Sequence, residues 1–352
     1  MPSSTSNSSA AIASGSSSQS RAPEGPWGRT WLVGVIVACV LLGAWELTLR
    51  SAGHPATLVD DMSLWSQARE RVATEEPNTI VLLGASRILL AASTETIAAE
   101  CPGHSVVMLA ISGRQAVASL ADLANDDSFR GIVVCSVSAA SLSARQHRDQ
   151  KAYLDFYATQ WNLNHDLNRR IATAVQSNLA MVHPNVNLRE ALFDTFKNKH
   201  FPKPFYLQAF ADRSHSGDYS MVDLTVHRQR RLQLLAEGAM GARRVPVETW
   251  LEDARHVAQL AAKIEARGGR VAFVRLPTTG EHWEFDSNHF PRGDYWDRWA
   301  ALPGGGLKLH FLDVPEMTTF DCPDGSHIDT SDRAQFTLIL IQALRDRGLF
   351  DR

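Results

Sequence analysis

The sequence predicts an α/β protein with a doubly wound parallel sheet and a helix-rich insertion, preceded by one transmembrane helix. Three observations lead to this prediction. Short apolar runs recur along the chain, and most are continuous instead of alternating, as in strands that are covered on both faces. Segments with helical periodicity separate these runs, which is typical of folds that alternate strand and helix. A long apolar segment near the N-terminus has the length needed to cross a bilayer.

The N-terminal part of the chain predicts a disordered tail followed by a membrane span. Residues 1–28 are rich in Ser, Ala, Gly and Pro and contain almost no side chains that form a core. Residues 29–50 predict a transmembrane helix, whose apolar run extends from Trp31 to Leu49. A cleaved signal peptide is the main alternative, although no Ala-x-Ala pattern follows the run. The flanks contain arginines and interfacial tryptophans: Arg29, Arg50, Trp31 and Trp45.

The charges around this span predict its orientation. Arg21 and Arg29 precede it, while Arg50 follows it ahead of Asp60 and Asp61. Because cytoplasmic flanks are enriched in basic residues, we expect a single-pass protein of the inner (cytoplasmic) membrane with its globular domain outside the cytoplasm. The formal net charge of -3, with no basic cluster, argues against a nucleic-acid partner.

The remaining elements follow in order. Residues 51–77 predict a connector with one short helical pattern from Leu64 to Val72, and residues 78–352 predict the globular domain. The segment from about 141 to 245 is rich in helical patterns and aromatic residues and has no clear strand, so we interpret it as an insertion that covers the edge of the sheet with the candidate site. The predicted strands are 80–83, 105–109, 131–137, 270–276 and 307–314, and the predicted helices are 93–100, 115–123, 247–267 and 336–344.

The four cysteines predict no disulfide. Cys39 falls in the span and Cys135 in a predicted strand, which leaves Cys101 and Cys322 as the only plausible pair. These two residues are expected at opposite ends of the strands, too far apart to be bridged.

A serine follows the first predicted strand, in Leu83-Gly84-Ala85-Ser86-Arg87. Ser86 is expected where a buried parallel strand ends and a helix begins, and open α/β sheets bind their ligands at that end. Gly84 would let the backbone turn tightly there. A serine hydroxyl needs a neighbouring base to act as a nucleophile. Without one, Ser86 is simply a helix N-cap.

A carboxylate and an imidazole lie together near the C-terminus, in Asp324-Gly325-Ser326-His327. His327 is the candidate base, and Asp324 the acid that orients it, with Asp321 and Asp329 as alternatives. The alternative for the motif itself is a solvated turn. The backbone amides of Ser86 and Gly113 are candidate oxyanion donors, because Gly113 follows the second strand at the same edge of the sheet.

Together these segments resemble the SGNH, or GDSL-like, hydrolase superfamily. Gly84-Ala85-Ser86 matches its first block, Gly113 its second and the segment from Asp324 to His327 its last. The resemblance covers roughly residues 78–350, without the insertion. It implies a flavodoxin-like three-layer fold and a catalytic serine, aspartate and histidine.

This sequence departs from the superfamily pattern at two places. Ala85 replaces the usual aspartate before the serine, and the Gly-x-Asn-Asp block that supplies an oxyanion asparagine is not evident after the third strand. Ser136 or Ser138 occupies that neighbourhood. The oxyanion hole is therefore the least complete part of the resemblance.

Further segments resemble membrane-anchored bacterial cell-envelope members of the superfamily: Trp45-Glu46-Leu47 with Arg50, Arg275-Leu276-Pro277-Thr278, and Tyr295-Trp296-Asp297. Some such relatives act with machinery that acylates exopolysaccharide or teichoic acid. The resemblance implies a serine esterase or O-acyltransferase that acts on an acyl ester, with acetyl as the expected group, of a cell-envelope carbohydrate. One alternative is a catalytically silent scaffold or glycan-binding partner of a membrane acyltransferase. A lipid-directed esterase at the membrane surface is another.

Three arginines at strand ends are candidate substrate-binding residues. Arg87, Arg114 and Arg275 could bind a carboxylate or phosphate of an anionic glycan. Solvated arginines, or ion pairs with Glu284 and Asp297, are the alternative. The spacing of the histidines and tryptophans near residues 282–296 fits no zinc pattern, so we expect neither a metal nor a cofactor.

Overall fold

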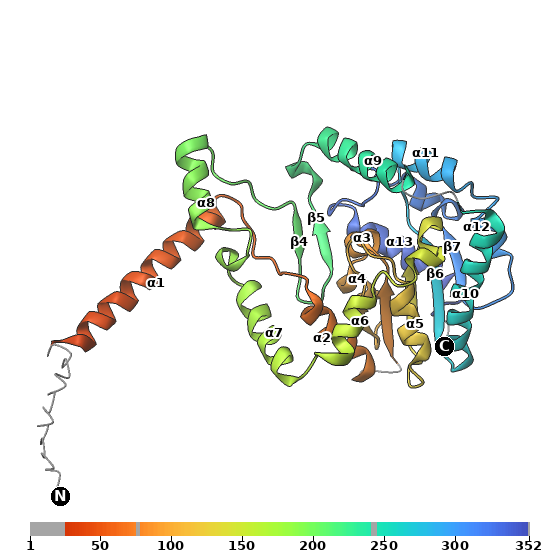
Figure 1. Ribbon diagram of the computed structural model, residues 1–352, viewed down its shortest axis with the longest axis horizontal. Helices are drawn as coiled ribbons and strands as arrows, with labels where there is room; N and C mark the ends of the chain where they lie inside the picture. The colour runs from red at the N-terminus through yellow and green to blue at the C-terminus, as the bar shows by residue number, and fades with distance from the viewer. Residues whose placement is uncertain (1–24, 75–77, 241–244, 351–352) are drawn as a thin grey trace, which may run out of the picture. The chain divides into compact units, whose positions relative to one another are not determined.

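The computed structural model describes residues 25–74, 78–240 and 245–350. Its main sheet has five parallel strands in the order β2-β1-β3-β6-β7 (Figure 1), which confirms the predicted α/β fold with a parallel sheet. Each strand overlaps a predicted one, but β7 ends earlier than predicted, because a 3-10 helix begins at Phe311. The strands are β1 (Thr79–Leu83), β2 (Ser105–Met108), β3 (Ile132–Ser136), β6 (Arg270–Arg275) and β7 (Leu307–His310).

Helices cover both faces of this sheet (Figure 1). Ile80 and Leu82 of β1 pack into one core, while Val81 and Leu83 pack into the other. All four side chains are fully buried, which explains why the strand is a continuous apolar run. The first core contains α3 (Ser86–Ala91), α4 (Thr94–Glu100) and α13 (Arg333–Arg345). The second contains α2 (Met62–Thr74), α5 (Val117–Asn125), α10 (Val247–Ala266) and α12 (Trp296–Ala300).

Helix α2 belongs to this second core although it precedes the predicted start of the globular domain. Its Trp65 is completely buried, and the indole Nε1–H donates a 3.0 Å hydrogen bond to the Leu109 carbonyl beyond β2. Burial of an indole with its polar atom satisfied stabilises the packing of α2 on the sheet.

The segment from about 141 to 245 is largely helical, as expected, but it also contains an antiparallel pair of strands, β4 (Leu207–Ala209) and β5 (His215–Gly217). These strands have three residues each and include polar side chains, so no alternating pattern marks them in the sequence. The buried Arg213 in the turn between them pairs with Asp60 at 2.7 Å and donates to the carbonyls of Met108 and Ala110. These contacts fasten the hairpin to the end of β2.

The other elements of this segment and of the C-terminal half are mostly short. The helices are α6 (Lys151–Thr159), α7 (Leu163–Gln176), α8 (Leu188–Phe193), which continues as a π-helix (Asp194–Asn198), α9 (Leu224–Met240) and α11 (Gly280–His289). The 3-10 helices are η1 (Ala139–Leu142), η2 (Ala144–Gln146), η3 (Ala180–Val182), η5 (Tyr219–Met221), η6 (Phe311–Asp313) and η7 (Pro315–Thr319).

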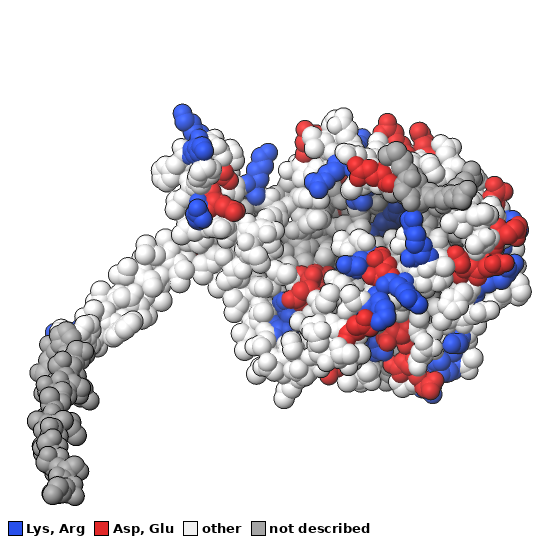
Figure 2. All heavy atoms as spheres, in the orientation of Figure 1, with Lys and Arg blue, Asp and Glu red and all other residues white. Residues whose placement is uncertain are grey.

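One long apolar helix, α1 (Trp27–Ser51), lies near the N-terminus. It is long and apolar enough to cross a membrane, and a signal sequence would have the same character. Its surface is almost free of charged side chains (Figure 2). The predicted tail falls mostly outside the described residues, and the helix begins at Trp27, two residues before the predicted start at residue 29. All four cysteines are free thiols.

Candidate active site

Ser86 lies where β1 gives way to α3, at the carboxyl edge of the sheet. Gly84 has φ +150°, and a Cβ at this position would lie 2.7 Å from Ile88 Cγ2 and 2.9 Å from Ser136 Cβ. Only glycine therefore fits this turn. The buried Gln150 donates a 3.3 Å hydrogen bond to the Gly84 carbonyl and so supports the turn from the other side.

The loop before α13 brings a histidine to this serine. Ser86 Oγ lies 2.7 Å from His327 Nε2, and His327 Nδ1 lies 2.8 Å from Asp324 Oδ2. The other carboxylate oxygen of Asp324 accepts hydrogen bonds of 2.9 Å from the backbone amides of Ser326 and His327. The loop thus folds around its own aspartate, which fixes the imidazole between the carboxylate and the serine.

The two alternative aspartates make other contacts. Asp321 accepts a 2.8 Å hydrogen bond from the Thr279 hydroxyl. Asp329 accepts hydrogen bonds from the Tyr219 amide and from Ser331. Of the three candidates, Asp324 is the aspartate in contact with His327.

Burial and charge set the protonation of this pair. Burial would raise the pKa of Asp324. The hydrogen bond from His327 and the positive charge of Arg231 on α9 outweigh burial and hold this pKa well below its usual range. Burial, the largest influence on His327, lowers the pKa of its imidazole. The Asp324 carboxylate opposes this shift, and the positive charges of Arg231 and Arg87 add to it. The His327 imidazole therefore gains its second proton at a lower pH than a free histidine does.

Two residues of the insertion also contact the pair and were not identified from the sequence. Arg231 of α9 places Nη2 3.2 Å from Asp324 Oδ2 and 3.1 Å from His327 Nδ1. The Tyr219 hydroxyl donates a 3.3 Å hydrogen bond to Asp324 Oδ2. Arg231 belongs to the polar stretch Arg228-Gln229-Arg230-Arg231, which has the appearance of a solvated helix face, so no local signal distinguishes it.

Of the three arginines predicted at the sheet edge, Arg87 lies closest to the serine and histidine loops. Its Nε is 3.2 Å from the Ser326 hydroxyl, and its Nη2 is 2.9 Å from His282 Nε2. Burial, followed by the charge of Arg87, lowers the pKa of His282 to about 3, so this imidazole is neutral and accepts the hydrogen bond.

The second predicted arginine and the predicted oxyanion glycine lie in the turn after β2. The Arg114 amide bonds to the Ile111 carbonyl, and Gly113 has φ +72° within this turn. The Arg114 guanidinium donates a 3.0 Å hydrogen bond to the Asp149 carbonyl. Gly113 is exposed at the carboxyl edge of β2, the strand next to β1.

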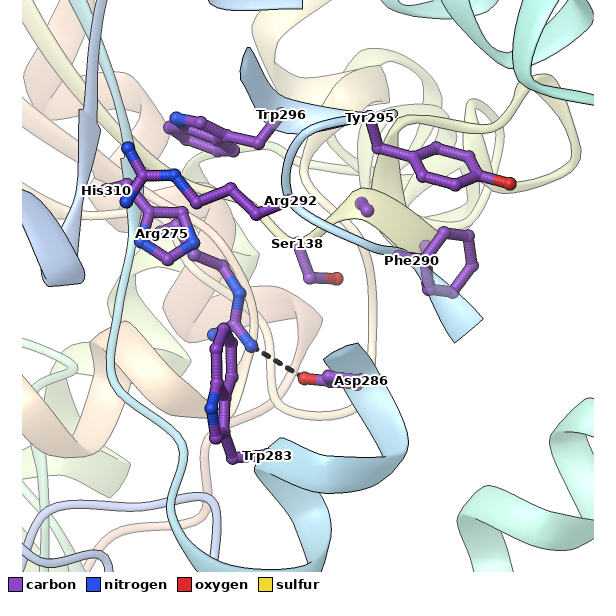
Figure 3. A pocket seen from close by; sticks show the side chains of 11 residues that line it. Ser138, Arg275, Trp283, Asp286, Phe290, Arg292, Tyr295, Trp296 and His310 are labelled. Carbon is purple, nitrogen blue, oxygen red and sulfur yellow. Dashed lines mark hydrogen bonds and ion pairs between the residues drawn. The ribbon is translucent and has the colours of Figure 1, made fainter. Parts of the chain in front are cut away.

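The third predicted arginine, Arg275, is buried and bonded to protein groups (Figure 3). Its Nη2 lies 2.6 Å from Asp286 and 2.9 Å from the Thr278 hydroxyl. Burial lowers its pKa to about 9, and the charge of Arg87 acts in the same direction. The observed ion-pair partner is thus Asp286 instead of Glu284 or Asp297.

A cavity of about 480 Å³ opens beside Asp324. Its walls come from α9, from the first turn of α11 and from the aspartate-histidine loop. The lining includes Arg228, Arg231, Leu232, Thr279, Gly280, Glu281, His282, Asp321, Cys322, Asp324 and Gly325.

Within the described residues, no group of three or more His, Cys, Asp or Glu side chains is arranged to hold a metal ion. Comparison with known proteins found no family model, no curated protein and no solved structure that matches this chain. The chain is therefore identified by its architecture alone, as an α/β protein with a five-stranded parallel sheet and one long apolar N-terminal helix.

Proposed function

We propose that this protein is a membrane-anchored serine esterase or O-acyltransferase of the SGNH type, which acts on an acyl ester of a cell-envelope carbohydrate. The observation that supports it most is the chain of contacts from Ser86 Oγ to His327 Nε2 at 2.7 Å and from His327 Nδ1 to Asp324 Oδ2 at 2.8 Å. This is the nucleophile, base and orienting-acid arrangement of acyl transfer. Counted along the chain, the strand order of the sheet is also that of flavodoxin-like folds.

In the first half-reaction, Ser86 Oγ attacks the ester carbonyl and forms a new C–O bond. The hydroxyl proton passes to His327 Nε2, while the Nδ1–H remains bonded to Asp324 and stabilises the imidazolium. When the tetrahedral intermediate collapses, the bond to the alcohol oxygen breaks and Nε2–H protonates that oxygen. The sugar leaves as an alcohol, and the acyl group remains on Ser86.

In the second half-reaction, His327 Nε2 removes a proton from the acceptor hydroxyl, which attacks the acyl-enzyme. Water as the acceptor gives a free acid and defines an esterase. A sugar hydroxyl as the acceptor gives a new ester and defines a transferase. The same three side chains serve both outcomes, so the acceptor is chosen by what binds beside them.

The proposed oxyanion donors are backbone amides. Ser86 is the first residue of α3, and the amides of a helix's first turn have no partner within the helix. The Gly113 amide, in the turn after the neighbouring strand, is the second proposed donor. Arg87 and Arg114 are partly exposed and are proposed to bind an anionic group of the glycan. Arg275 is left out of this role because its guanidinium is buried as well as paired with Asp286.

We propose that α1 anchors the protein in the inner membrane with the α/β domain outside the cytoplasm. The apolar surface of α1 and the arginines before it support this arrangement. A glycan of the cell envelope would then lie on the same side of the membrane as Ser86.

A fluorophosphonate probe tests the proposed nucleophile without knowledge of the natural substrate. The full chain is expected to be labelled at Ser86, and Ser86→Ala is expected to abolish labelling and the hydrolysis of acetylated sugars. Ser331→Ala is the matched control, since this exposed serine bonds to Asp329, away from His327. An unlabelled wild-type chain, or full labelling of Ser86→Ala, would contradict the mechanism.

The silent-scaffold alternative is favoured by one specific observation, the absence of the oxyanion asparagine block after β3, where the chain continues Val137-Ser138-Ala139. A scaffold would bind glycan with unchanged affinity in Ser86→Ala and would not react with the probe. The two functions therefore give opposite results in the same experiment.

A further inference from the structure

A helical segment that follows α7 in the chain exposes several large apolar side chains. Helix α8 and its π-helical continuation, residues 188–198, form one turn-rich segment that we name the α8 segment. Its most exposed apolar side chains are Leu188 at 48%, Leu192 at 47%, Phe193 at 54% and Phe196 at 80% of full exposure. Apolar side chains gathered in this way indicate a surface that is covered by a partner.

The chain before and after this segment is bonded to residues in the last turns of α1 and in the loop that follows it. Before the segment, the Glu46 carboxylate accepts 2.9 Å hydrogen bonds from the amides of Ala180 and Met181. The Arg50 guanidinium donates a 2.8 Å hydrogen bond to the Asn178 carbonyl.

After the segment, His54 Nε2 lies 3.1 Å from the Pro202 carbonyl. The His54 ring also packs edge-on against Phe201 and Phe205, with centroids 6.0 and 5.8 Å apart. The chain on both sides of the α8 segment is therefore bonded to residues near the C-terminal end of α1. A partly buried carboxylate that accepts hydrogen bonds from two backbone amides and from an arginine is a specific attachment.

The charges around the segment are mainly positive. The segment and the residues just after it contain two acidic and four basic residues. The acidic residues are Glu190 and Asp194, and the basic residues are Arg189, Lys197, Lys199 and Lys203. The Lys197 ammonium lies 4.7 Å from the centroid of the Phe193 ring, so a cation and an exposed aromatic ring are in contact on this surface. Figure 2 shows basic and acidic side chains together with uncharged surface over α8.

We propose that the α8 segment inserts into the headgroup region of an anionic phospholipid bilayer, beside the point where α1 leaves the membrane. Apolar side chains would enter the acyl boundary, and the lysines would extend to the phosphates, as in interfacial amphipathic helices. The inference rests on the proposed membrane span of α1. It adds a second membrane contact, made by the α/β domain itself, to the proposed span.

The test uses the full chain in vesicles of phosphatidylethanolamine and phosphatidylglycerol that contain a spin-labelled phospholipid. A fluorophore is attached at Phe196→Cys in a Cys39→Ser background, in which the remaining native cysteines are buried. Leu234→Cys on α9, where the native side chain is 55% exposed, is the matched control. A third sample carries the fluorophore on native Cys39 and reports on the span itself.

Quenching by the spin-labelled lipid is expected at positions 39 and 196, and none is expected at position 234. Lys197→Glu combined with Lys199→Glu should weaken the quenching at 196, since each lost cation reduces attraction to an anionic surface roughly fivefold. Replacing phosphatidylglycerol with a zwitterionic lipid should act in the same direction.

The possible failures can be distinguished. Quenching at 39 without quenching at 196 would overturn the interfacial role of the α8 segment and leave the anchor intact. A fluorophore at 196 that is shielded from water but not quenched by lipid would indicate a protein partner, and would also overturn the proposal. Absence of quenching at 39 would remove the membrane span and the inference together.

Discussion

Replacement of Arg231 is expected to move the pH dependence of Ser86 reactivity. The Arg231 guanidinium lies 3.1 Å from His327 Nδ1, and its charge lowers the pKa of the imidazole. Two unit charges about 4 Å apart interact by about 4 kcal/mol at an effective dielectric of 20, and by about 1 kcal/mol in bulk water. The Arg231 side chain is 31% exposed, so we take an interaction energy of about 1.5 kcal/mol, between these two limits.

The sign of the change follows from the proposed role of His327 as a neutral base. Loss of the cation raises the pKa of the imidazole, so the histidine becomes protonated, and reactivity is lost, at a higher pH than in the wild type. Arg231→Met should therefore shift the acid limb of fluorophosphonate labelling toward higher pH, while Arg231→Lys should shift it less. The measurement is the second-order labelling rate across the acid range.

A matched control lies one helical turn away. Arg228 bonds to the Pro323 carbonyl at 2.6 Å and is also in α9, so Arg228→Met should alter local packing without moving the acid limb. An unchanged limb in Arg231→Met, or a shift toward lower pH in a folded variant, would refute the electrostatic reasoning. Circular dichroism of each variant establishes that it is folded.

Two further substitutions test the geometry of the site. Gly84→Ala should lower the free energy of unfolding, measured by urea denaturation, by about 3 kcal/mol. The new methyl group would collide with Ile88, and the backbone angle at this position favours glycine. A loss below about 1 kcal/mol would show that the turn relaxes easily. Asp324→Asn should keep the fold but reduce the labelling rate by about a thousandfold or more, since an amide no longer holds His327 in the required tautomer. A rate within about tenfold of wild type would mean that Asp324 does not orient the imidazole.

The sheet was predictable because its strands are buried on both faces. Four side chains of β1 alternate between two cores, and all four are apolar: Ile80, Val81, Leu82 and Leu83. They therefore form a continuous apolar run that can be recognised in the sequence. The contact between Ser86 and His327 was also predictable, since both motifs follow strands whose carboxyl ends meet at one edge.

Other parts of the site could not be found in this way. Arg231 and Tyr219 reach Asp324 from the insertion, and their approach depends on how α9 and η5 pack, which no local pattern encodes. The end of β6 places Arg275 at the correct edge, but the direction of its guanidinium is decided by Asp286 on a neighbouring helix. Strand ends predict location, whereas tertiary neighbours decide where a long side chain points.

The separation in sequence between Ser86 and His327 has a consequence for how the protein folds. The hydrogen bond between them joins residues separated by 241 positions, with most of the α/β domain in the loop that it closes. Closing a loop of this length costs chain entropy, and folds dominated by contacts of high sequence separation fold slowly. In a growing chain Ser86 precedes His327 by 241 residues, so the proposed acyl transfer would begin only after both residues have been made and the domain has folded.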